Sequence, residues 1–112
     1  MKEKELPAGI TAEMIAAAKQ KYGEKNVKYI DLPMDDEGTE FKTVLACVPS
    51  RTVMEQYRKF SDNDPKKADE ILVKNCLLSH KDEVLADDGL FYAALNGIAE
   101  LIPIRRAIVK NL

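Results

Sequence analysis

The alternation of apolar and polar positions first predicts a helix and then two strands. Apolar side chains recur at helical spacing over residues 12–22, where Thr11 can cap the start and Gly23 can end the helix. Residues 26–32 and 40–48 are rich in β-branched and aromatic side chains, and the turn-forming segment between them predicts a β-hairpin. The C-terminal half of the second strand is apolar on both faces, so we expect helices to cover it.

Two helices are predicted directly after the hairpin. Ser50 can cap a helix whose apolar stripe reaches Phe60, and Asp64 followed by Pro65 predicts the start of the next helix. We expect the buried face of that helix to carry mostly small and aliphatic side chains, namely Ala68, Ile71, Leu72, Asn75 and Cys76, widened by Val73 and Leu77.

The rest of the chain predicts a polar loop and a long helix. Residues 79–88 are mostly polar and are expected to form the loop, whereas residues 91–102 place apolar side chains at every position of a helical stripe. Pro103 should kink or restart this helix, because it removes a backbone donor and crowds the preceding turn. Ile104 and Ile108 then continue the stripe to the C-terminus.

Together these elements predict one α+β domain over residues 11–112, with an N-terminal helix, a β-hairpin and three to four helices packed on it. Residues 1–10 lack periodicity and contain Pro7 and Gly9, which predicts a flexible N-terminal arm. An isolated hairpin is marginally stable without further packing. A homodimer in which a second copy extends the sheet is therefore one possibility.

Composition and charge narrow the class of function. The 112 residues are 46% hydrophobic and 32% charged, which is typical of a single folded domain. The 17 basic and 19 acidic residues leave a net charge of -2, so nucleic acid is not an expected partner. The only local basic cluster, Arg105, Arg106 and Lys110, is interpreted as favourable charge at a helix end. With no signal peptide and no apolar run of about 18 residues, we expect no membrane contact and a cytoplasmic location.

Two cysteines and one histidine are the candidates for nucleophilic chemistry. Cys47 and Cys76 are far apart in the sequence and outside any Cys-x-x-Cys motif, which predicts two small buried side chains rather than a disulfide. His80 follows Cys76 by four residues, a spacing that could pair an imidazole with a thiol. Because Cys76 falls on a predicted buried stripe, a structural role is favoured over an activated nucleophile.

The acidic clusters do not predict a metal site. Residues 35–40 and 82–88 are rich in carboxylates, but neither has the alternate spacing, glycine and distant glutamate of a calcium loop. Gly38, Gly89 and Gly97 stand alone, with no phosphate-binding loop around them. We therefore expect no cofactor and no metal, and a protein that binds a partner rather than an enzyme.

Residues 40–112 combine several features of one family. An apolar strand ends at Pro49-Ser50 and is followed by a helix, then by the segment Asp69-Glu-Ile-Leu-Val-Lys-Asn-Cys76-Leu, and then by Asp87-Asp88-Gly-Leu-Phe91 leading into the C-terminal helix. This part of the chain resembles a phage tail assembly chaperone of the kind encoded in prophages. The helix predicted over residues 12–22 has no counterpart that we can match in this family, and it is a candidate element for dimerisation.

The resemblance implies a non-virion protein that binds the tape measure protein, keeps its apolar helices soluble and recruits tail tube subunits. The location would then be the host cytoplasm. No catalytic residue comes with the resemblance. The candidates for contact with a partner are apolar residues in excess of one stripe per helix, namely Met54, Tyr57, Leu77, Leu78, Ile104 and Val109. Each of them could instead complete the core.

Two other classes of function stay open. A small regulatory or inhibitory binding protein of bacterial or phage origin, such as an antitoxin-like or anti-repressor protein, would form a tight stoichiometric complex with a toxin or a repressor. A small enzyme that uses Cys76 or the acidic loops would need a cofactor or a substrate that the sequence does not indicate.

Overall fold

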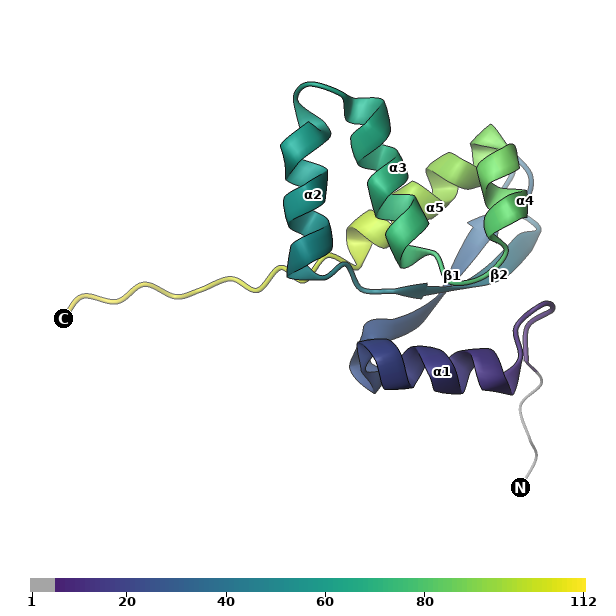
Figure 1. Ribbon diagram of the computed structural model, residues 1–112, viewed down its shortest axis with the longest axis horizontal. Coiled ribbons are helices and arrows are strands. Elements are labelled where there is room, and N and C mark those ends of the chain that lie inside the picture. Colours follow the sequence, from purple (N-terminus) through teal and green to yellow (C-terminus); the bar gives the residue numbers. More distant parts are fainter. Residues whose placement is uncertain (1–5) are drawn as a thin grey trace.

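The computed structural model of the chain describes residues 6–112 and confirms the predicted α+β class (Figure 1). Part of the predicted flexible arm, residues 1–5, lies outside the described residues. The elements in chain order are α1 (Ala12–Tyr22), a 3-10 turn (Glu24–Asn26), β1 (Val27–Pro33), β2 (Phe41–Cys47), α2 (Arg51–Ser61), α3 (Pro65–Cys76), α4 (Lys81–Ala86) and α5 (Asp88–Glu100).

Local side-chain chemistry decides where most of these helices begin. Thr11, Ser50 and Asp64 each accept, through a side-chain oxygen, a hydrogen bond from the backbone N–H three residues further on, at 3.1 to 3.2 Å. Asp87 caps α5 in the same way. Pro65 occupies the first turn of α3, where its missing N–H leaves no intrahelical bond unmade. The predicted caps of α1, α2 and α3 are thereby confirmed.

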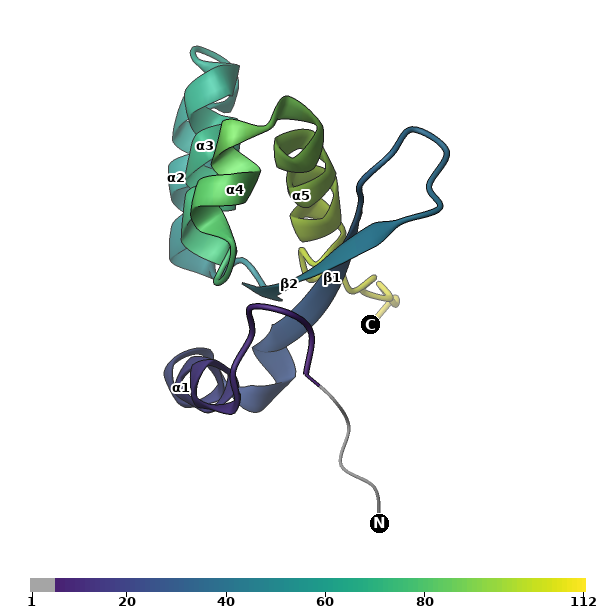
Figure 2. The same ribbon diagram turned by 90° about the vertical axis from the view of Figure 1, so that its right-hand side faces the viewer.

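The two strands pair antiparallel, with Val27 opposite Cys47 and Pro33 opposite Phe41. Helices cover the hairpin on both faces, as Figures 1 and 2 show with α1 on one side and α3 to α5 on the other. On the α1 side, Leu45 packs in a small buried cluster. On the other side, Val44 joins the main core formed with α3, α4 and α5. The expectation that helices cover the apolar half of the second strand is therefore confirmed.

The chain itself closes part of the outer edge of β2. Directly after α3, Leu77 forms an isolated antiparallel bridge with Ala46. The Leu78 N–H donates to the Leu45 carbonyl at 2.7 Å, and the Leu45 N–H donates to Ser79 Oγ at 2.8 Å. Residues 77–79 thus cover part of this edge without forming a strand, and they satisfy backbone groups of Leu45 that a bare hairpin would leave unpaired.

Helix α5 approaches β1 closely because it carries a glycine at the contact. A Cβ on Gly97 would lie 2.7 Å from Cγ2 of Ile30, nearer than side chains can approach. Ile30 is branched at Cβ and stiff, so it cannot easily move aside. Gly97 is therefore required for this helix to pack on the strand at its present distance.

The predicted buried face of α3 is confirmed in part, since Ile71 is only partly buried and Asn75 is not buried at all. Ala68, Leu72 and Cys76 are buried in the core. Asn75 is instead exposed, and its side-chain amide donates to the carbonyl of Ile71 at 2.7 Å. An amide that bonds its own helix backbone needs no partner from the core, which is why it can lie outside.

The prediction of a loop over residues 79–88 is wrong, because α4 occupies most of it. This helix is only six residues long, and its one buried residue is Val84, which is fully buried in the main core. So short a helix depends on tertiary packing rather than on a periodic stripe. His80 precedes it in a left-handed backbone conformation, with φ of 56°, rather than lying at the C-terminal end of a helix.

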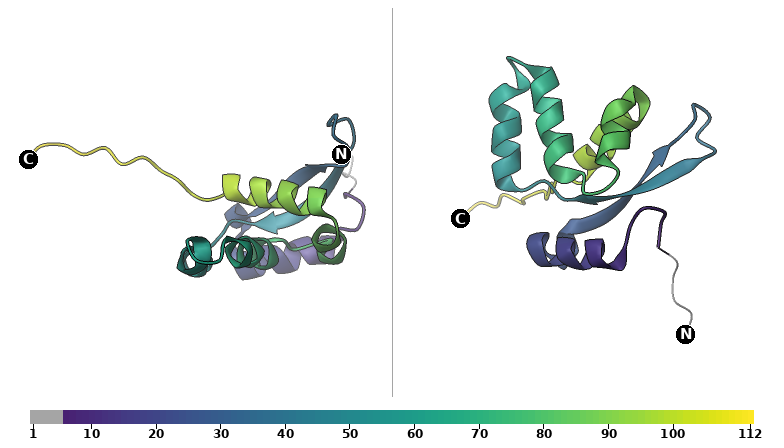
Figure 3. Two further views of the ribbon diagram at one scale, coloured as in Figure 1. Left: turned by 90° about the horizontal axis from the view of Figure 1, so that it is seen from above. Right: turned by 45° about the vertical axis from the view of Figure 1, so that its right-hand side comes forward.

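The prediction of a helix continuing to the C-terminus is also wrong. Helix α5 ends at Glu100, and residues 103–112 form neither helix nor strand but run away from the body of the protein (Figures 1 and 3). Pro103 disfavours the helical conformation of the residue before it and supplies no N–H donor. Beyond it no core surface supports a new short helix, so Arg105 and Arg106 do not lie at a helix end.

Candidate protein-binding surfaces

The six residues predicted to contact a partner do not form one surface. Leu77 is fully buried in the main core, so it is inaccessible to a partner in this structure. Met54, Tyr57 and Leu78 are partly buried and pack against the same core. The structure therefore places these four residues in or against the core, where they stabilise the fold.

The other two candidates, Ile104 and Val109, lie on residues 103–112, which we call the C-terminal segment. Their side chains are 81% and 94% exposed, and Ile108 between them is 83% exposed. Leu112 is likewise exposed. A group of large apolar side chains with this much exposed surface is unfavourable in water unless a partner covers it.

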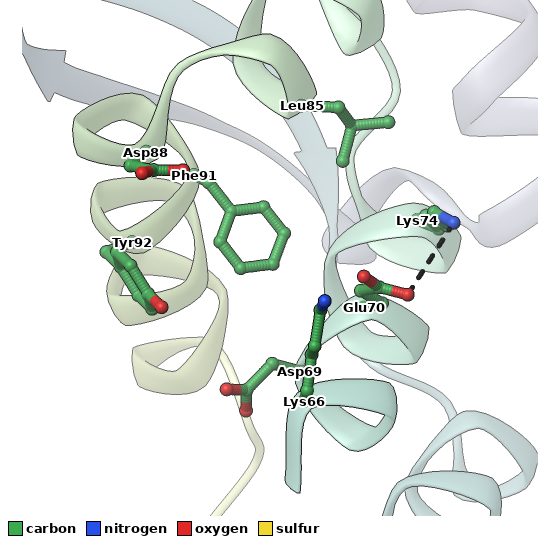
Figure 4. Close-up of a pocket in the computed structure, with 8 residues that line it drawn as sticks. All are labelled: Lys66, Asp69, Glu70, Lys74, Leu85, Asp88, Phe91 and Tyr92. Atoms are coloured by element: carbon green, nitrogen blue, oxygen red, sulfur yellow. Dashed lines mark ion pairs between the residues drawn. The ribbon is translucent and has the colours of Figure 1, made fainter.

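Sequence analysis did not find a groove that lies between α3, α4 and α5, which we call the α3–α5 groove (Figure 4). It encloses about 470 Å³. Figure 4 shows the Phe91 ring pointing from α5 into the space in front of α3, with Leu85 of α4 above it. The residues that line the groove are Lys66, Asp69, Glu70, Lys74, Leu85, Asp88, Phe91 and Tyr92.

Apolar side chains form one wall of this groove. The rings of Phe91 and Tyr92 meet edge to face, with centroids 5.5 Å apart and planes at 83°. Tyr92 is 62% exposed and Leu85 is 39% exposed, whereas Phe91 is partly buried against the core. The wall thus offers an incoming apolar side chain two exposed contacts and a partly buried ring.

Charges of both signs surround the apolar wall. Glu70 Oε1 lies 3.9 Å from Lys74 Nζ, an exposed ion pair of little energetic value. Asp69 and Asp88 have no ion-pair partner within residues 6–112. These two carboxylates are available to a cationic ligand.

Sequence reasoning missed this groove for two reasons. Leu85 lies in the segment expected to be a loop, so it was not considered as part of a helical face. Tyr92 lies off the apolar stripe of α5, and an aromatic side chain at such a position was the one signal that could have indicated an exposed contact.

The outer edge of β1 is a second open feature. Because Met34 N–H bonds to the Glu40 carbonyl at 2.7 Å, the alternation of the ladder directs the backbone groups of Tyr29 and Asp31 away from β2. Within residues 6–112, no backbone hydrogen bond reaches these outward groups. A shallow groove of about 350 Å³ adjoins the edge, lined by Ile15, Lys19, Glu24, Val27, Lys28, Tyr29 and Leu45.

The two cysteines are buried and unoxidised, as predicted. They lie close enough for the two thiols to interact, which together with burial raises the pKa of Cys76 above its ordinary value. His80 does not pair with Cys76, since its ring nitrogens bond to Ser79 Oγ at 2.7 Å and to the Ala8 carbonyl at 3.0 Å. The structure thus does not assemble the thiol–imidazole pair considered from the sequence.

His80 instead connects residues 6–10 to the body. The Ala8 carbonyl can only accept, so Nε2 of His80 carries the proton and Nδ1 can accept from the Ser79 hydroxyl. A Cβ on Gly9, whose φ is 83°, would lie 2.5 Å from His80 Nε2. Ile10, the next residue, is buried. This end of the predicted arm is therefore in contact with the domain.

The carboxylate clusters are organised as turns and caps. Asp35 accepts a hydrogen bond from the Thr39 N–H at 2.9 Å and another from the Thr39 hydroxyl, and these bonds lower the pKa of the Asp35 carboxyl. Over residues 6–112, no group of three or more His, Cys, Asp or Glu side chains is arranged to hold a metal ion. None of the helices described is both long and apolar enough to cross a membrane.

Comparison with protein-family models, with curated proteins and with solved structures finds no match to this chain. The resemblance to tail assembly chaperones consequently stays a prediction from the sequence.

Proposed function

We propose that this chain is a non-enzymatic protein-binding module that acts as an assembly chaperone of the phage tail type. In this proposal it binds a tape measure protein in the host cytoplasm, keeps the apolar helices of that client from aggregating, and brings tail tube subunits to it. Support comes from the sequence resemblance of residues 40–112 and from one structural feature.

That feature is the C-terminal segment. Its large apolar side chains are at least 81% exposed, so its own chain does not bury them. An amphipathic helical client buries such side chains along its own apolar stripe, and the segment can order on contact. Of the six candidates, Ile104 and Val109 are therefore the two that this proposal retains as contacts.

The test is co-expression of the tagged chain with the tape measure protein encoded at the same locus, scored by the amount of client that stays soluble and co-purifies. The informative variant is Ile104→Asp combined with Val109→Asp, which places charge in the contact without touching the core. Met34→Asp is the matched control, because Met34 is 46% exposed and lies at the hairpin end, outside the segment.

We expect a soluble stoichiometric complex with the wild-type chain and with Met34→Asp, and loss of the complex with the double variant. Equal rescue by all three chains would exclude the C-terminal segment as the contact. Failure of the wild-type chain to bind or solubilise the client would refute the chaperone function, and a tight complex with a toxin or repressor would support the regulatory alternative.

A further inference from the structure

The C-terminal segment differs in charge from the rest of the chain. It holds three basic residues, Arg105, Arg106 and Lys110, and no acidic residue. Of the 17 basic residues this leaves 14 in residues 1–102, against all 19 acidic ones. The segment is thus a basic, apolar and exposed extension of an acidic body, and charge complementarity favours contact between the two.

The α3–α5 groove has the chemistry to receive it. Its wall presents Leu85 and Tyr92, both exposed, to isoleucine or valine side chains. Asp69 and Asp88 line the groove and have no ion-pair partner among the described residues. Each carboxylate can therefore accept hydrogen bonds from an arginine. Lys66 and Lys74 also line the groove, but Lys74 is already paired with Glu70.

The segment does not occupy the groove of its own chain. The groove residues of α5, namely Asp88, Phe91 and Tyr92, lie in the first turns of that helix, whereas the segment leaves from its opposite end after Glu100. Figure 1 shows it running away from the body beyond α2. Each copy therefore presents an open groove at one end and a free segment at the other.

We propose that the C-terminal segment of one copy docks in the α3–α5 groove of a second copy. Ile104, Ile108 or Val109 contacts Leu85 and Tyr92, while Arg105 and Arg106 pair with the groove carboxylates. The contact joins two different surfaces, so two copies can exchange segments reciprocally or several copies can associate head to tail. This self-association does not rest on the proposed function, since it requires no client.

The open edge of β1 is a poorer site for the segment. Its adjoining groove carries Lys19 and Lys28 against one acid, Glu24, which repels a basic ligand. Strand β1 ends in Pro33, and a proline on an edge strand is one of the features by which natural sheets block pairing at an edge. Charge therefore distinguishes the two open features in favour of the α3–α5 groove.

The test uses purified full-length chains in sedimentation velocity across a concentration series at low and at high salt. Tyr92→Lys adds a positive charge to the groove, and Arg105→Glu with Arg106→Glu reverses the charge of the segment. Tyr29→Lys is the matched control, because Tyr29 is a second exposed tyrosine, on β1. Leu85→Lys is a second groove variant, and circular dichroism verifies that every variant is folded.

We expect concentration-dependent association of the wild-type chain that weakens as salt screens the charges. Each groove or segment variant should weaken association by about tenfold or more, and Tyr29→Lys should leave it unchanged. Mixing Tyr92→Lys with the doubly substituted segment variant should restore association, because one partner supplies an intact segment and the other an intact groove.

The opposite results overturn the proposal. A wild-type chain that stays monomeric throughout the series refutes docking between copies. This holds also if the chain is monomeric because each segment folds back on its own groove. Association that survives in both groove variants, or that is lost in Tyr29→Lys, assigns the contact to another surface. A mixture that fails to associate shows that groove and segment are not the two halves of one contact.

Discussion

Replacing Ser79 with alanine removes a hydroxyl that joins three parts of the chain. Ser79 is 4% exposed, and its Oγ accepts the hydrogen bond of the Leu45 N–H at 2.8 Å while lying 2.7 Å from Nδ1 of His80. Nε2 of His80 in turn donates a hydrogen bond to the Ala8 carbonyl. The substitution therefore leaves a strand N–H without a partner and weakens the anchoring of residues 6–10.

A buried donor left without a partner costs about 1–3 kcal/mol, so we expect Ser79→Ala to lower the free energy of unfolding by about 2 kcal/mol. With a urea m-value of about 2 kcal/mol/M, the midpoint of unfolding should fall by about 1 M with the slope unchanged. The melting temperature should fall by roughly 8 °C. Far-UV circular dichroism measures both transitions, and hydrogen exchange should be faster at the Leu45 amide.

The control is Ser61→Ala at the end of α2, where the hydroxyl bonds only to the carbonyl of Arg58 in its own helix. This change should stay within about 0.5 kcal/mol of the wild type. A Ser79→Ala midpoint that equals that of Ser61→Ala would refute the reasoning, because it would mean that water or a backbone shift satisfies the Leu45 N–H.

Three further predictions concern packing and thiols. Gly97→Ala should destabilise the protein by about 1–2 kcal/mol in urea titrations, because the clash with β1 outweighs the gain in helix propensity. Gly89→Ala in the same helix, where a Cβ meets nothing nearer than 3.7 Å, should not destabilise, and equal losses would contradict the packing argument. Leu77→Ala should cost about 2–5 kcal/mol, and a near-neutral result would show that this residue is not core. Native protein should resist a thiol reagent at Cys47 and Cys76 until urea unfolds it, and rapid reaction of the folded chain would contradict their burial.

Much of the fold was predictable because its signals are local. A cap requires one side-chain oxygen and a backbone N–H three residues away, so Ser50 and Asp64 could be assigned directly from their neighbours. The hairpin followed from two β-rich stretches around a turn. Because both faces of β2 are apolar, helices were predicted to cover it, and this is confirmed. The sequence did not indicate which helix would cover which face.

The candidate surfaces were far less predictable. Excess apolar residues do not reveal their own exposure, so Leu77 was grouped with Val109 although the first is fully buried and the second 94% exposed. The α3–α5 groove depends on α4, whose six residues are held by one buried anchor, Val84, rather than by a repeated pattern. No periodicity could have indicated it.

The sequence by itself determined the class of fold, the starts of α1, α2 and α3 and the burial of the cysteines, because these depend on spacings of a few residues and on composition. Only the tertiary structure decided that the chain beyond Pro103 leaves the body, that residues 77–79 close an edge of the sheet, and that His80 holds Ala8. The physical reason is distance along the chain. Contacts between residues more than thirty positions apart, such as Leu45 with Ser79, exist only once packing has brought their segments together.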